Sequence, residues 1–329
     1  MKGMFINMST IRIVTIICWI VTALALAGLV IWFLFGSAFG AWSDGMGNWS
    51  IGFGGTENLT GPYESQGAYS ADATGLHSVR IRWVSGEVTV IPHDGNEIQI
   101  TEFAQRELRD SERLRMSTSG GTLTIRFTEQ RSIGRMPQKR LEVLVPRDLI
   151  KSLNMLDIDT VSGGVNIKDS GAARININSI SGAVDLANMN SQFIDISTTS
   201  GDLTAASVRA DKLDASSVSG SMQISDAIIA TLDVSATSGR TTATGEFDRI
   251  DVSTVSGDIT VTSATVPNRV NISAVSGGTD IYIPNQGEIT VSHTAVSGRF
   301  TSDLPVIIQS NAAYSFSSVS GNTRIHALG

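Results

Sequence analysis

Acidic and amide side chains recur at one fixed place in a repeated segment of this sequence. Seven of them lie six residues before the glycine of a Ser-Gly pair: Asp157, Asn176, Asp195, Asp214, Asp233, Asp251 and Asn271. Such a row of oxygens could gather cations or bind the hydroxyl groups of a polymer. Four cations stand two residues earlier and would offset repulsion between stacked acids: Arg174, Lys212, Arg249 and Arg269. The calcium-binding pattern G-G-x-G-x-D is missing, so we interpret the row as a solvated, charged sheet face.

Other residue types that could do chemistry do not form a known arrangement. The four histidines are scattered without metal-ligand spacing: His77, His93, His293 and His326. No P-loop is present and no G-x-G-x-x-G opens a helix, so nucleotide binding has no support. Cys18 is the only cysteine, which excludes a disulfide or a thiolate metal site within the chain. We therefore predict no catalytic residue, no metal site and no cofactor.

The Ser-Gly pair itself recurs nine times, whereas a nucleophilic serine is needed once. Its glycines are spaced by 18 to 23 residues: Gly163, Gly182, Gly201, Gly220, Gly239, Gly257, Gly277, Gly298 and Gly321. A fixed period near 20 is typical of a solenoid, in which each repeat forms one coil. We predict that these glycines are structural corners, because a residue without Cβ allows a backbone conformation or a close approach that other residues block. The serine hydroxyl is expected to bond neighbouring backbone or the serine of the next coil.

Apolar residues alternate with polar ones on both sides of each corner. They stand seven and five residues before the glycine and two and four after it, as in Ile194, Ile196, Leu203 and Ala205 around Gly201. This pattern predicts two strands per coil with one buried face. The residue two places before the glycine is also apolar in most coils, but it is out of phase with this alternation. If it is buried as well, the strand must contain a bulge before the corner.

These elements predict an all-β fold, a right-handed single-stranded parallel β-solenoid with ~19-residue coils over residues 151–329. Residues 76–150 are expected to form an N-terminal β cap. Within it, "VRIRWVSGEVTV" fits the coil pattern, and three later segments are typical of hairpin strands. At the other end we expect "NTRIHAL" to be the edge strand and "DLPVIIQ" to cover it.

The N-terminal region predicts a membrane anchor. Residues 13–35 carry no charge over 23 positions, and a helix of that length spans ~34 Å, enough to cross a bilayer. Lys2 and Arg12 precede this segment, so residues 1–12 are expected in the cytoplasm and everything after residue 40 outside. The length favours an uncleaved anchor over a cleaved signal peptide. Residues 36–75 are rich in Gly and Ser and are predicted to be a flexible linker.

Charge excludes one class of partner and distinguishes two regions. The net charge of −7 gives a nucleic-acid role little support. Residues 102–151 hold eleven Lys or Arg against seven acids, whereas residues 152–329 hold nine against seventeen. The partners we expect are the lipid bilayer, through residues 13–35, and an unknown envelope protein or surface polymer.

The run "VRIRWVSGEVTVIPHDGNEIQI", the segment "LEVLVP" and the recurring S-G-x-V/L-x-I/L resemble the bacterial putative-adhesin domain of unknown function, also called the toastrack domain. The resemblance covers about residues 76–329. It implies a membrane-linked, envelope-facing β-solenoid and supplies no catalytic residues. We expect a non-catalytic, membrane-anchored interaction or scaffold module outside the cytoplasm. The alternatives are a signalling partner of a membrane sensor, docking through the basic cap region, and a carbohydrate-active enzyme, which the short central coils disfavour.

Overall fold

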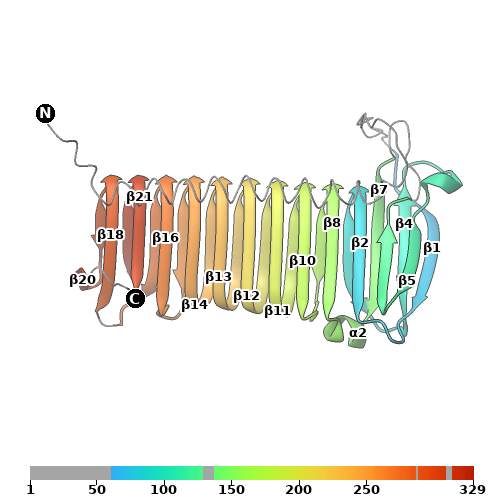
Figure 1. Ribbon diagram of the computed structural model, residues 1–329, viewed down its shortest axis with the longest axis horizontal. Helices are drawn as coiled ribbons and strands as arrows, with labels where there is room; N and C mark the ends of the chain where they lie inside the picture. The colour runs from blue at the N-terminus through green and yellow to red at the C-terminus, as the bar shows by residue number, and fades with distance from the viewer. Residues whose placement is uncertain (1–60, 129–136, 287, 309–312) are drawn as a thin grey trace, which may run out of the picture.

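Parallel strands repeat along one axis, and on one side of the regular stack they run towards the Ser-Gly corners (Figure 1). The computed structural model describes residues 61–128, 137–286, 288–308 and 313–329. The strands that end at the corners in the regular part of the stack are β8 (Met155–Ser162), β10 (Arg174–Ser181), β11 (Val184–Ser200), β12 (Leu203–Ser219), β13 (Met222–Ser238), β14 (Thr241–Ser256) and β16 (Arg269–Ser276). The shorter strands that leave the corners are β9 (Val165–Lys168), β15 (Ile259–Ser263) and β17 (Thr279–Pro284). The fold is the predicted all-β solenoid, wound right-handedly.

Neighbouring coils stack in register, with one shift between β13 and β14 at Ile224–Ala227. Ile175 of β10 is paired with Leu156 of β8 on one side and with Ile194 of β11 on the other, and all three side chains are buried. Repeating apolar positions therefore form continuous columns through the interior. One coil cannot bury its apolar face alone, so the stacking of neighbours supplies the core.

The predicted bulge before the corner is wrong. Buried positions continue without a shift to the third residue before the glycine, where most coils carry a small hydroxyl side chain: Thr160, Ser179, Thr198, Ser217, Thr254 and Ser318. The apolar residue one place later, such as Val161 or Val218, is partly exposed on the outer face. The alternation changes at the glycine itself, because the turn there reverses which side of the backbone faces the core.

A second corner, six residues after the glycine, was not predicted. Four non-glycine residues adopt a left-handed conformation there with φ between 51° and 58°: Asp169, Asn188, Ser207 and Asp226. Asp and Asn tolerate this conformation better than other side chains. Their recurrence six residues after the glycine is therefore the feature of the sequence that indicates the second corner. The residue after each of these four corners is buried again: Ser170, Met189, Val208 and Ala227. Each coil therefore has three sides rather than two.

The N-terminal end is built around the coil of β2 (Ser78–Ser85) and β3 (Val88–His93). β2 is parallel to β8 on one side and to β6 (Thr122–Arg126) on the other, and β3 lies likewise between β9 and β7 (Lys139–Pro146). Antiparallel strands complete this end: β1 (Glu64–Asp72), β4 (Glu97–Ala104) and β5 (Arg115–Ser119). The connections include the short helices η1 (Asp110–Glu112) and α2 (Arg147–Ser152). β1 lies within the predicted linker 36–75, and it forms a strand because β4 offers it an unpaired edge.

A fully buried ion pair joins the segments of this cap. Lys139 Nζ lies 2.7 Å from Glu102 Oε1, and both side chains are completely buried. The ammonium also donates to the carbonyl oxygens of Glu112 and Phe127, and it lies 3.7 Å from the centre of the Phe127 ring. Glu102 accepts the backbone N–H of Leu114. Burial lowers the pKa of Lys139 to about 8, against the opposing effect of Glu102.

The C-terminal end does not follow sequence order. β21 (Tyr314–Ser320) pairs with β16 on one side and with β18 (Ile289–Ser297) on the other. β22 (Thr323–Leu328) lies in the same way between β17 and β19 (Phe300–Ser302). The last coil in the sequence is thus inserted beneath the coil that precedes it, as the position of β21 inside β18 shows (Figure 1).

The expectation that "NTRIHAL" forms the edge is therefore wrong. β22 has parallel partners on both sides, and β20 (Val306–Ile308) pairs with β18 instead. The inserted coil carries buried Tyr314 and Phe316, and Tyr314 donates its hydroxyl to the carbonyl of Pro267 at 2.9 Å. Large aromatic side chains need apolar neighbours above and below, and an inner coil provides both.

Within the described ranges, no helix is long and apolar enough to cross a membrane. The predicted span 13–35, the cytoplasmic segment 1–12 and residues 36–60 of the predicted linker lie outside these ranges.

Candidate functional site

The corner glycines stand in one column along the stack. A Cβ added to Gly220 would lie 2.2 Å from the carbonyl oxygen of Gly201, and at the other eight corners this distance to the adjacent glycine is between 1.9 and 2.3 Å. No real Cβ atom tolerates such a contact with backbone, so every coil needs glycine at this place. Gly321 lies against Gly277 and Gly298 lies against Gly321, which repeats the exchanged order of the last two coils.

The serines before these glycines act through their backbone. The carbonyl of Ser200 accepts the N–H of Gly182 at 3.1 Å, and the carbonyl of Ser219 accepts that of Gly201 at 3.1 Å. Their hydroxyl groups are exposed at the corner and make no hydrogen bond within the described chain. The predicted hydroxyl contact between coils is therefore replaced by a main-chain one, and the serine contributes a small polar side chain at the surface.

The acidic and amide side chains form the predicted outward column. Asp195, Asp214 and Asp233 are direct neighbours on β11, β12 and β13. Lys212 lies 3.0 Å from Asp214 and 3.5 Å from Asp233, and Arg80 lies 3.0 Å from Asp157 at the N-terminal end of the column. Ion pairs thus offset part of the repulsion within the column, as the interpretation of a solvated face requires.

The pKa values of the column reflect this crowding. Burial raises the pKa of Asp195 and of Asp233, and the Asp214 carboxylate between them adds to the rise. The hydrogen bond to Asp214 raises the pKa of Lys212. Beside the acids runs a column of hydroxyls, in which Ser197 and Ser216 lie 2.8 Å apart. The outer face is therefore a periodic array of carboxylates and hydroxyls.

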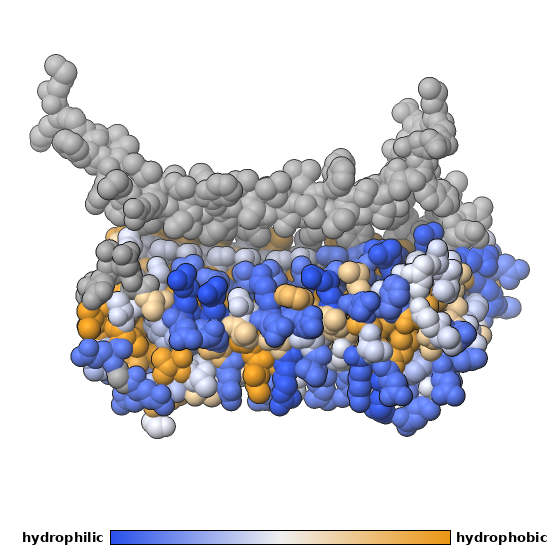
Figure 2. Space-filling model, turned by 60° about the horizontal axis from the view of Figure 1, so that its bottom comes forward, coloured by the Kyte–Doolittle hydropathy of each residue, from blue (hydrophilic) through white to orange (hydrophobic). Residues whose placement is uncertain are grey.

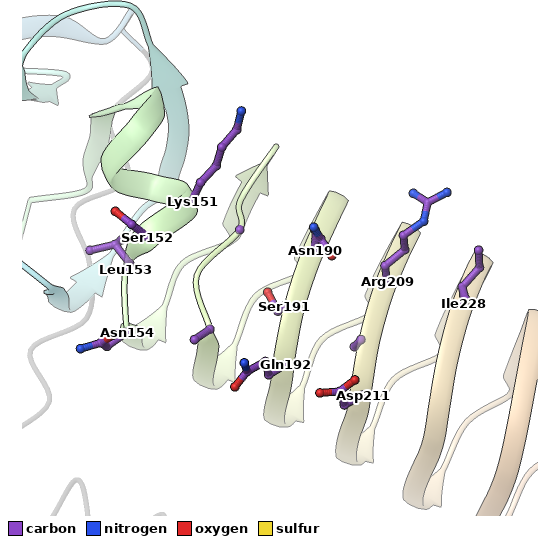
Figure 3. A pocket seen from close by; sticks show the side chains of 13 residues that line it. Lys151, Ser152, Leu153, Asn154, Asn190, Ser191, Gln192, Arg209, Asp211 and Ile228 are labelled. Carbon is purple, nitrogen blue, oxygen red and sulfur yellow. The ribbon is translucent and has the colours of Figure 1, made fainter.

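A groove of about 530 Å³ lies beside α2, where the coils begin to turn towards this outer face. Its floor consists of small residues: Gly171, Ala173, Ser191 and Ala210. The segment between β9 and β10 is not a strand, which leaves the space open at this point. One rim carries Lys151, Asn190, Arg209 and Ile228, and the opposite rim carries Asn154, Gln192 and Asp211 (Figure 3). No sequence motif indicates this groove, because its residues come from four coils and a helix.

The groove holds unsatisfied polar groups. Ser191 is 8% exposed, and its Oγ has no hydrogen-bond partner. The charged groups of Lys151, Arg209 and Asp211 are exposed and take part in no ion pair of the described chain. This differs from the column nearby, where Lys212 bridges two carboxylates. The groove can therefore offer two cations, neutral amides and one buried hydroxyl to a ligand.

A family model described as Toastrack DUF4097 matches residues 76–327, more than half of the chain. The chain belongs to the Toastrack DUF4097 family. The toastrack domain is also similar to solved structures of a "putative adhesin" from Bacteroides fragilis (12% identity, 79% of this chain and 95% of that chain, TM-score 0.45) and a "putative lipid binding protein" from Parabacteroides distasonis (16% identity, 78% and 96%, TM-score 0.42). A "putative adhesin" from Parabacteroides merdae is similar at 12% identity, 80% and 96% coverage and a TM-score of 0.43. No curated protein matches the chain.

The four histidines of the toastrack domain lie apart from one another. His77 is exposed, His93 bonds the carbonyl of Glu97 at 2.8 Å, and His326 lies 3.0 Å from Asp280. Burial lowers the pKa of His293, near the C-terminal end. Over the described residues, no three His, Cys, Asp or Glu side chains are grouped so that they could hold a metal ion.

Proposed function

We propose that this chain is a non-catalytic, membrane-anchored module that presents its solenoid outside the cytoplasm to an envelope protein or a surface polymer. The observation that carries the proposal is the outer face, on which carboxylates and hydroxyls repeat in register from coil to coil. A rigid array of this kind contacts an extended partner at many equivalent points. A catalytic site would instead concentrate different groups around one substrate.

Anchoring is supported by the sequence, through the uncharged segment 13–35 and the preceding Lys2 and Arg12. By the positive-inside rule, these features support a solenoid on the side of the membrane opposite the N-terminus. Membership of the Toastrack family supports an adhesin-like role for the solenoid.

The two alternative functions have less support. Docking of a sensor on the basic cap has less support because part of the positive charge there is already paired: Arg80 and Arg82 bind Asp157, and Arg106 binds Glu112. Glycoside hydrolysis ordinarily uses a pair of carboxylates, and Asp211 is the one acidic residue among those that line the groove.

The test combines topology with contact. In a Cys18→Ala background, we expect a membrane-impermeant maleimide to label Arg240→Cys on intact cells and Lys2→Cys only after lysis. A photo-crosslinking residue at position 216, on the outer face, should give adducts in intact cells, whereas one at position 226, on the second corner, should not. Labelling of Lys2→Cys on intact cells would exclude the proposed orientation, and equal adducts from both positions would exclude the outer face as the contact surface.

A further inference from the structure

The groove beside α2 differs from the rest of the solenoid in charge. Two cations and one acid line it: Lys151 comes from the end of the basic segment 102–151, whereas residues 152–329 hold nine bases against seventeen acids. Figure 2 shows the underside of the stack as mostly hydrophilic, with separate apolar patches. A locally positive groove on an acidic domain attracts anionic groups that the neighbouring acidic column repels.

The cations are placed to act together. Lys151 projects from α2 and Arg209 from β12, and both extend to the same side of the groove with Asn190 between them (Figure 3). Asn190 and Arg209 are register partners on adjacent strands. Two amides and Asp211 form the other rim, so hydroxyl groups of a ligand would find both acceptors and donors there.

The floor supplies a hydroxyl without a partner. Ser191 Oγ is buried and bonds to nothing in the described chain, and a buried polar group in this condition costs free energy that a ligand hydrogen bond would recover. The small floor residues leave room for a flat ring to lie against them. From α2 to β13 the groove crosses about three inter-strand spacings, roughly 14 Å, which is longer than one sugar ring.

We propose that this groove binds carboxylate-bearing sugar units of a surface polymer. The carboxylate lies between Lys151 and Arg209, ring hydroxyls bond Asn190, Gln192 and Asp211, and one hydroxyl reaches Ser191 Oγ. The inference rests on the proposed function, since it names the class of polymer that the solenoid meets. Residues 190–192 of the groove directly precede, on β11, the strand segment that carries Asp195 of the outer face.

The probe is a tetramer of β-1,4-linked glucuronic acid, titrated calorimetrically into the full-length chain. We expect binding that weakens with added salt, and about tenfold weaker binding in Lys151→Ala and in Arg209→Ala, because hydrogen bonds to charged groups are the stronger ones. Arg240→Ala removes an exposed cation elsewhere on the stack and should leave affinity unchanged. The neutral glucose tetramer with the same linkage should bind at least tenfold more weakly.

Ser191→Ala separates a ligand role from a structural one. Because Oγ is unpartnered in the free protein, its removal should leave the thermal midpoint unchanged or higher, while affinity for the tetramer falls several-fold. A lowered midpoint with unchanged affinity would assign the hydroxyl to folding and overturn its role here.

The inference would be overturned by no binding of the charged tetramer, by unchanged binding in the Lys151→Ala/Arg209→Ala double variant, or by equal binding of the neutral tetramer. Millimolar inorganic phosphate that displaces the tetramer completely, and binds as tightly itself, would show a simple anion site and would also overturn it. None of these outcomes bears on the topology and crosslinking test, so a failed groove leaves the proposed function standing. Conversely, if the tetramer binds but the topology is reversed, the groove remains a binding site and the proposed presentation of the solenoid outside the cytoplasm is rejected.

Discussion

At the N-terminal end of the stack the coil β2–β3 is covered by strands that come later in the sequence, and at the C-terminal end the last coil lies beneath one that comes earlier. Both ends therefore depart from the one-after-another order of the central coils. In each case the coil that would otherwise be terminal receives parallel partners on both sides. Covered strands cannot recruit another chain through an open edge.

The two ends are held by different forces. The N-terminal cap uses antiparallel strands and the completely buried pair of Lys139 and Glu102. The C-terminal end repeats the ordinary coil geometry, including corner glycines and buried aromatic residues at Tyr314 and Phe316. Its outermost coil keeps Val296 65% exposed. One end is therefore closed by a unique polar contact and the other by a further copy of the repeat.

The largest effect is expected from breaking the unique contact. Lys139→Met removes the counterion of Glu102 and leaves a buried carboxylate, which should lower the free energy of unfolding by about 3–5 kcal/mol. Urea unfolding measures the loss, and hydrogen exchange should show it over β4 and β7 first. Lys168→Met, at an exposed position on β9, is the matched control. A loss below about 1 kcal/mol would mean that the pair does not hold the cap.

A smaller effect is expected from the C-terminal end. Gly321 lies between Gly277 and Gly298 in the column, so Gly321→Ala places a Cβ 1.9 Å from the Gly277 carbonyl oxygen and displaces the inserted coil. We expect a loss of about 2–4 kcal/mol from this clash. In Gly278→Ala, the added Cβ meets nothing closer than 3.6 Å, and stability should change little.

Hydrogen exchange decides the extent of that effect. In Gly321→Ala, faster exchange should appear in β16 through β22, because β21 and β22 pair directly with β16 and β17, and not in the cap strands at the far end of the stack. Equal exchange in the glycine variant and the control would show that the last coil is not inserted as described.

The smallest effect is a pH dependence confined to the N-terminal end. The hydrogen bond from Arg106 lowers the pKa of Glu112 from its ordinary 4.5 to about 2. Since the folded pKa lies below the unfolded one, this stabilisation is present above about pH 4.5 and is lost as the pH falls towards 2. We expect the free energy of unfolding to drop between pH 5 and pH 3 more in the native chain than in Glu112→Gln. Urea unfolding at the two pH values measures this drop. An equal drop in the native chain and in Glu112→Gln would contradict the prediction.

The repeated coils could be predicted from the sequence because their signals are local. The spacing of the corner glycines gives the coil length, and apolar residues such as Ile194 and Ile196 show by their alternation which face is buried. The outward position of the acidic column follows from the same alternation. The three-sided coil was missed because the corners at Asp169 and Asn188 use ordinary residues in an uncommon conformation.

The candidate groove was beyond sequence reasoning for a different reason. Lys151 and Arg209 are 58 positions apart, and neither stands in a recognisable motif. Only the stacking of coils places them on one rim, and only the turn between β9 and β10 opens a space between them. Ser191 Oγ has no hydrogen-bond partner, and this property depends on all of its neighbours in the folded structure.

The sequence by itself determined the all-β class, the coil length, the buried columns and the need for glycine at each corner, because these follow from backbone geometry repeated in every coil. The order of the coils at the two ends was decided only by the tertiary structure. Each coil offers nearly the same register to any other, so local pattern cannot say which coil lies beside which. That choice depends on the unique contacts of each end, the buried Lys139 in the cap and the aromatic side chains of the inserted coil.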